Sequence, residues 1–172
     1  MIERFNRILF VLTRYVAWLG MLSLLGAMAV TTADIILRKT EGEGIFGAVD
    51  IVQLLIMGAA FLAIPHGFIT RSHVSISLVV DMLPPPAVAL AGVLAAALGT
   101  AFMLAIAVFG YDSALMQYDY GDVSLTLGVP KIYYWVPLLF GAGLSVVVTV
   151  HMTVEQLYLL FSGRRNLLAD EE

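Results

Sequence analysis

The chain has 172 residues, of which 60% are hydrophobic and 13% charged, with no cysteine and a formal net charge of −4. A soluble domain carries about 25% charged residues, so an apolar excess of this size indicates an integral membrane protein. The lack of cysteine excludes disulfides, thiolate metal sites and thiol catalysis, and the sequence has no basic cluster that would suggest a nucleic-acid partner.

Residues 1–14 have the pattern of an amphipathic helix. Apolar residues at positions 2, 5, 8, 9 and 12 recur with helical spacing, whereas charged and polar residues occupy the other side. Two interpretations stay open: a short helix that lies at the membrane surface, or simply the polar start of the first span.

Four apolar segments follow that are long enough to cross a bilayer, whose core of roughly 30 Å needs about 20 apolar residues in a helix. We expect four membrane-spanning helices at residues 15–37, 47–70, 86–111 and 130–160. Residues 161–172 are expected to form a polar cytoplasmic tail. Three consecutive prolines set the start of the third helix near Pro86. The short loops favour antiparallel neighbours. The sequence therefore predicts a single all-α integral membrane domain with four transmembrane helices and a short N-terminal amphipathic segment.

Four spans place both termini on one side of the membrane, and the distribution of Lys and Arg predicts which side that is. With the ends inside, the cytoplasmic segments hold six basic residues, namely Arg4, Arg7, Arg14, Arg71, Arg164 and Arg165. The outer segments hold only three, Arg38, Lys39 and Lys131, together with five acids. Because short cytoplasmic segments carry the excess of basic residues, we expect both termini in the cytoplasm, with the loop at 39–47 and an acidic loop at 112–122 outside.

Two acids lie near the outer ends of the first and second helices, where an intramembrane carboxylate is a functional candidate. Asp34 and Arg38 are four residues apart, so they can form an ion pair on one helix face. Asp50 is close enough to the interface to reach Arg38 or Lys39. We interpret these residues as a structural ion-pair network, with a proton or cation site as the alternative. Gln53, one turn after Asp50, is interpreted as a partner in an interhelical or intersubunit hydrogen bond.

The helix at 86–111 is rich in alanine and glycine, and small residues let helix backbones approach closely within a membrane. We therefore expect Gly92 and Ala96 to lie at a close contact, either within the subunit or with a partner. Trp135 belongs to an aromatic group that marks the outer interface. Arg71 and His73 occupy the polar corner after the second helix, at the inner side.

His66 and His151 are expected near the inner ends of the second and fourth helices, at similar depth. Facing histidines on two helices can ligate a haem iron, so a haem-bearing membrane electron carrier is an alternative function. The simpler interpretation is that each imidazole binds a backbone carbonyl, a lipid headgroup or, for His151, Glu155. The sequence has no phosphate-binding loop, zinc motif or nucleophile–base pair. We therefore expect neither enzyme activity nor a cofactor.

Several of these features follow one another in an order typical of one family. The first helix ends in D-x-x-x-R, Asp34 to Arg38, and an acid, Asp50, opens the second. A His-Val pair at His73 precedes the prolines, and the fourth helix is introduced by L-G-V-P-K-I-Y-Y-W-V-P-L-L-F-G-A-G-L, which begins at Leu127. Over nearly its whole length the chain resembles the small membrane subunit, of the DctQ type, of tripartite ATP-independent periplasmic (TRAP) transporters.

The resemblance implies a non-catalytic subunit of a sodium-driven transporter in the bacterial inner membrane. In that family the small subunit packs beside a large membrane subunit, which holds the substrate and sodium sites, and enlarges its static scaffold. A periplasmic binding protein delivers an organic acid to the outer face, so the outer loops would face that protein. The implied partners are therefore the large subunit in a heterodimer, the binding protein and membrane lipids. A self-contained homo-oligomeric transporter remains as an alternative, and it would require Asp34 or Asp50.

Overall fold

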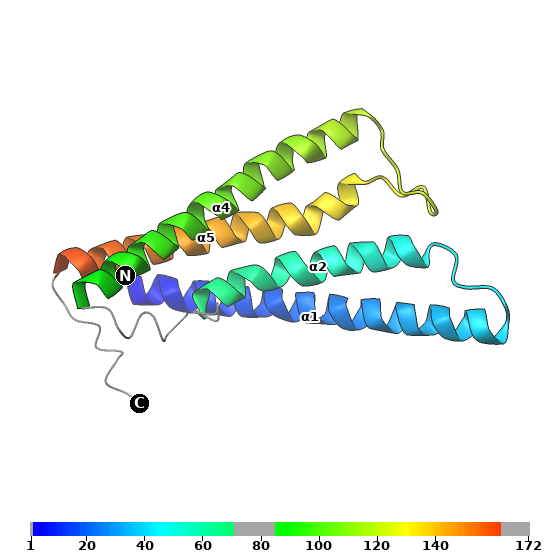
Figure 1. The fold of residues 1–172 in the computed structure, drawn as a ribbon, viewed down its shortest axis with the longest axis horizontal. Helices are drawn as coiled ribbons and strands as arrows, with labels where there is room; N and C mark the ends of the chain where they lie inside the picture. The colour runs from blue at the N-terminus through cyan, green and yellow to red at the C-terminus, as the bar shows by residue number, and fades with distance from the viewer. Residues whose placement is uncertain (1, 71–84, 163–172) are drawn as a thin grey trace.

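The computed structural model of the chain describes residues 2–70 and 85–162, and in these residues four long helices account for most of the structure. The helices are α1 (Ile2–Thr40), α2 (Ala48–Ile69), α4 (Pro85–Asp119) and α5 (Ile132–Ser162) (Figure 1). Each helix contains an apolar stretch with the length and composition needed to cross a membrane. The all-helical architecture with four candidate spans, expected from the sequence, is confirmed.

Two helices extend beyond the ends expected from the sequence. α1 is continuous from Ile2, so residues 2–14 do not form a separate helix. α4 continues past Tyr111 to Asp119, whereas the sequence places a loop from Asp112 onward. The extra turns are stabilised by packing on α5, because Ala114 is buried and the Gln117 side chain accepts a hydrogen bond from Trp135. A charged residue on the exposed side of a helix does not end it.

The helices lie side by side in a layer, in the order α1, α2, α5, α4 (Figure 1). Helices joined by a described loop are antiparallel, as expected, whereas α2 and α5 in the middle of the layer run in the same direction. We call the end that carries residues 41–47 and 120–131 the loop end. The two helix pairs diverge toward this end, and α4 lies farthest from α1 there (Figure 1).

Small residues bring α1 and α2 together. A Cβ atom built on Gly20 would lie only 3.2 Å from the carbonyl oxygen of Ala59, and one on Gly58 would lie 3.2 Å from the hydroxyl of Ser23. Helices in a membrane gain no hydrophobic free energy from association, because lipid tails are equally apolar. Close approach of the helices instead stabilises the pair through van der Waals contacts. Small residues therefore let the first helix pair approach closely.

α2 and α5 meet along an even tighter seam. A Cβ atom on Gly141 would overlap the carbonyl oxygen of Phe61, and the neighbouring positions on α5 are fully buried. Ser145 and Thr149 belong to this buried set, and their hydroxyls donate to carbonyl oxygens one turn earlier on α5, at 2.8 and 2.9 Å. Because both hydroxyls are satisfied within their own helix, they can face apolar neighbours without an unpaired donor. The seam joins the two helix pairs into one body.

α4 is the least buried of the four helices. It contacts α5 through Gly99 and Gly110, through the hydroxyls of Thr100 and Thr153, which are 3.1 Å apart, and through the bond from Trp135 to Gln117. Because the layer is one helix thick, most helices have exposed apolar sides. In a bilayer such sides can face either lipid or another membrane protein.

Candidate functional site

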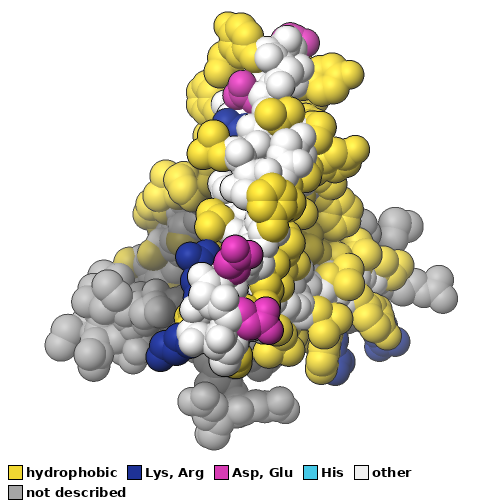
Figure 2. Space-filling view, turned by 90° about the vertical axis from the view of Figure 1, so that its right-hand side faces the viewer, with side chains coloured by type: hydrophobic (Ala, Val, Ile, Leu, Met, Phe, Trp, Pro, Cys, Tyr) yellow, Lys and Arg dark blue, Asp and Glu magenta, His cyan; other side chains and the backbone are white. Residues whose placement is uncertain are grey.

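The loop end gathers the polar residues that the sequence singles out. Figure 2 shows the layer from this end, where acidic and basic side chains lie among hydrophobic ones. Residues 41–47 connect α1 to α2, and residues 120–131 connect α4 to α5. The second loop lies beside the start of α2, because Leu127 packs directly over Gly47.

Asp50 holds the second loop against α2. Its carboxylate oxygen Oδ2 accepts the backbone N–H of Leu127 at 2.7 Å and that of Thr126 at 3.2 Å. The side chain is only 5% exposed, so this carboxylate is satisfied by amide donors and not by water. The expectation that Asp50 reaches Arg38 or Lys39 is wrong. The loop amides lie nearer and occupy the carboxylate.

Two further contacts fix the same junction. The hydroxyl of Tyr134, in the first turn of α5, donates to the carbonyl oxygen of Asp50 at 3.2 Å. Gly47 precedes α2 with a φ of 76°, a conformation in which a side chain is strained. A Cβ atom at this position would also overlap the side chain of Leu127. Glycine is therefore required at position 47 both by the backbone and by the loop above it.

The loop also has internal order. The Ser124 hydroxyl accepts the N–H of Val129 at 3.0 Å, and the N–H of Ser124 donates to the carbonyl of the same residue at 2.8 Å. Lys131 returns to Asp122 through its backbone N–H at 2.9 Å and through a side-chain ion pair at 3.6 Å. These bonds form a hairpin-like turn, and its apex residue, Leu125, is fully exposed.

The ion pair expected between Asp34 and Arg38 is present, with 2.8 Å between Oδ2 and Nε. The other carboxylate oxygen of Asp34 accepts the backbone N–H of Ile45 at 2.7 Å. Asp34 therefore fixes the first loop in the way that Asp50 fixes the second. Both carboxylates are engaged by N–H donors, which is the opposite of the converging oxygen atoms that a sodium or other hard cation needs.

Gln53 lies on the exposed side of α2, one turn from Asp50. It lines a groove of about 450 Å³ between α1 and α2, together with Thr31, Asp34, Ala48, Val49, Val52, Ile56 and Met57. Within the described part of the chain its amide has no hydrogen-bond partner. The structure therefore separates Gln53 from the residues that hold the loops.

The remaining candidates have mainly structural positions. Trp135 donates from Nε1 to the Gln117 side chain at 3.0 Å and so ties α5 to α4. A Cβ atom on Gly92 would meet the Gln156 side chain of α5 at 3.3 Å, so Gly92 faces its own subunit. The carbonyl of Ala96 accepts the hydroxyl of Thr100 at 2.9 Å. Arg71 and His73 lie outside the described residues.

Of the two histidines of the haem alternative, His66 faces α1. The Nδ1 atom of His66 lies 3.3 Å from the hydroxyl of Thr13, and its ring is tilted against Phe10 at 5.5 Å. α5, which contains His151, packs on another side of α2, through Phe61. In the described residues no group of three His, Asp or Glu side chains is arranged to hold a metal ion.

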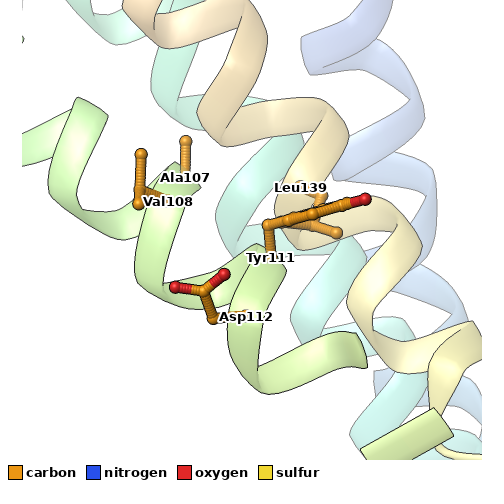
Figure 3. Close-up of a pocket in the computed structure, with 5 residues that line it drawn as sticks. All are labelled: Ala107, Val108, Tyr111, Asp112 and Leu139. Atoms are coloured by element: carbon orange, nitrogen blue, oxygen red, sulfur yellow. The ribbon is translucent and has the colours of Figure 1, made fainter. Parts of the chain in front are cut away.

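A shallow cavity of about 370 Å³ lies between α4 and α5, lined by Ala107, Val108, Tyr111, Asp112 and Leu139 (Figure 3). Its lining is mostly apolar, and the carboxylate of Asp112 is at its edge. Apart from Asp112, the only polar side-chain group in this lining is the Tyr111 hydroxyl, so the cavity lacks the several converging polar atoms of a substrate site. We interpret it as part of the helix surface.

Some functional residues are not evident from the sequence. The donors that hold Asp50 are backbone amides of Thr126 and Leu127, and backbone groups leave no signature in the residue types. For Tyr134, the sequence predicts only that it belongs to an aromatic group at the membrane interface, and not that it bonds to α2. The one available signal is the turn chemistry of Gly121 and Gly128, both with positive φ, which indicates an ordered loop.

These observations define the class of protein. The chain is a multi-pass α-helical membrane protein whose polar residues at the loop end hold connecting loops in place. The family model for tripartite ATP-independent periplasmic transporters, DctQ component, matches residues 27–159, which is more than three quarters of the chain. The chain therefore belongs to the DctQ family, the small non-catalytic membrane component of TRAP transporters. A search of curated proteins finds no match to it.

Proposed function

We propose that this chain is the small membrane subunit that packs on the large membrane subunit of a sodium-driven TRAP transporter and extends its static scaffold. The observation that supports a static role is the double attachment at the loop end. Asp34 holds the first loop through Ile45, and Asp50 holds the second through Leu127. A helix layer whose connections are fixed in this way resists relative movement of its helices, as a scaffold requires.

The loop end faces the outside of the cell in this proposal, and both termini lie in the cytoplasm of a bacterium. The loop end carries only three basic residues, Arg38, Lys39 and Lys131, whereas the segments proposed to lie inside carry six, and the side with more Lys and Arg is the cytoplasmic one. A periplasmic binding protein that delivers an organic acid would then meet the ordered turn around Leu125. The transported acid is bound by the other two components.

Co-purification tests the proposal directly. The tagged chain is expressed with the large membrane subunit, extracted in mild detergent and examined by mass spectrometry. A stoichiometric complex is expected, and sodium-gradient uptake in proteoliposomes should require both subunits and the binding protein. A homo-oligomer without the large subunit, or transport by this chain alone, would contradict the proposal.

Orientation has its own test, which the lack of native cysteine makes simple. A Leu125→Cys variant places one thiol at the fully exposed apex of the second loop. A membrane-impermeant maleimide should label it in intact spheroplasts. Labelling only after the membrane is opened would place the loop end in the cytoplasm.

A further inference from the structure

The groove between α1 and α2 contains a polar group that a lipid environment cannot satisfy. α2 has 22 residues, so it is about 33 Å long, hardly more than the roughly 30 Å core of a bilayer. Gln53 is five residues after the first residue of this helix, which places it about 7.5 Å along the axis. If α2 crosses the bilayer core along its length, the Gln53 amide lies within the hydrocarbon region, on the exposed side of the helix.

The described residues do not supply a partner for this amide. α1 packs on the side of α2 that contains Ala59 and Ala63, and α5 packs on the side that contains Phe61. Asp34 lines the same groove, but its two oxygens already accept N–H groups from Arg38 and Ile45. In the described residues Gln53 is thus left with two donors and an acceptor without partners.

The groove also has the form of a helix-binding surface. Val49 and Ile56, which are 69% and 50% exposed, line it together with Gln53, which is also exposed and lies between them on α2. Glutamine side chains within membranes hydrogen-bond across helix interfaces, and small or polar residues lie at such interfaces. Acyl chains can cover Val49 and Ile56 but offer no group to Gln53.

We infer that this groove is the docking site for a transmembrane helix of the large membrane subunit, and that this helix presents a hydrogen-bonding side chain to Gln53. The inference rests on the proposed function, because it takes the large subunit as the partner. It adds the face of the layer that the partner occupies. Asp34, which holds the first loop, then lines one end of the docking groove.

Site-directed crosslinking tests the position of the interface. Single-cysteine variants Val49→Cys and Ile56→Cys are labelled with a maleimide–benzophenone reagent and irradiated in membranes that contain the co-expressed large subunit. Leu98→Cys, 70% exposed on α4, is the matched control. Adducts with the large subunit are expected from the two groove positions. Adducts of those positions with lipid or a second copy only, or none while the complex still co-purifies, would overturn the inference.

A second variant tests the hydrogen bond. Gln53→Leu should lower the affinity for the large subunit by roughly three- to tenfold, since an interhelical hydrogen bond in a membrane contributes on this scale. Val147→Leu, on the exposed side of α5, is the control and should leave affinity unchanged. Because Gln53 makes no contact that holds the fold, the thermal stability of the isolated subunit should not fall.

The two levels of failure are distinguishable. If the wild-type chain does not co-purify with the large subunit, the proposed function is wrong. If the wild-type chain does co-purify but Gln53→Leu binds equally well and the groove cysteines give no large-subunit adduct, only the docking surface is wrong.

Discussion

The carboxylate of Asp50 and the backbone N–H of Leu127 are 2.7 Å apart, although 77 positions separate them in the sequence. This bond fixes the connection between the last two helices to the start of the second. It joins the two helix pairs at the loop end, as the seam around Gly141 joins them within the layer. The subunit is thus held together at two levels.

Removal of the Asp50 carboxylate should loosen the second loop. In Asp50→Ala, the amides of Thr126 and Leu127 lose their acceptor, so we expect their hydrogen exchange to become faster by about tenfold, together with a lower unfolding temperature. Asp50→Asn keeps one neutral acceptor and should have a smaller effect. Asp112→Ala, which removes an exposed acid of α4, is the control. Unchanged exchange at the two amides would mean that the loop is held by its internal bonds alone.

The Tyr134 hydroxyl provides a second measure of the same junction. Tyr134→Phe removes only the hydrogen bond to the Asp50 carbonyl and should lower the free energy of unfolding by about 1 kcal/mol. The neighbouring Tyr133 is 56% exposed, so Tyr133→Phe is the matched control and should have no effect. Thermal unfolding in detergent measures both. Equal stabilities for the two variants would contradict the assignment.

The seam between α2 and α5 should not accept even a methyl group. In Gly141→Ala, the new Cβ atom would overlap the Phe61 carbonyl, so the helices must separate, and we expect a loss of about 1–3 kcal/mol in unfolding free energy. Gly143, two residues later on α5, has open space where a Cβ would be, so Gly143→Ala is the control. That substitution should be neutral or slightly stabilising, because alanine favours helix. A tolerated Gly141→Ala would show that the seam is less tight than described.

Asp34 and Arg38 should not be equivalent, although they form one ion pair. The Arg38 side chain is 59% exposed and its ion pair with Asp34 is screened by solvent, so Arg38→Ala should have little effect on stability. Asp34→Ala also removes the acceptor of the Ile45 N–H and should destabilise the first loop more strongly. Limited proteolysis within residues 41–47 reports on that loop. Equal protease sensitivity of the two variants would indicate that the ion pair, and not the loop bond, is the important interaction.

The sequence was sufficient to predict the helices but not their arrangement. Uninterrupted apolar runs indicate the four spans, and the i, i+4 spacing predicts the pair of Asp34 and Arg38. The order of the helices in the layer depends on which small residues pack together. The contact of Gly141 with the Phe61 backbone has no sequence pattern in either helix that would predict it. The partner of Asp50 was missed because backbone amides are common to every residue. The extension of α4 was missed because Asp112 is compatible with an exposed helix surface.

The contact between Asp50 and the second loop has a consequence for biogenesis. Asp50 is made by the ribosome well before Thr126 and Leu127, so the first helix pair enters the membrane while the amides that engage its carboxylate do not yet exist. Until then Asp50 must remain hydrated at the membrane surface, which holds the start of α2 at the boundary with water. Arrival of the later loop replaces that water and completes the subunit, so that final assembly waits for the last helix pair.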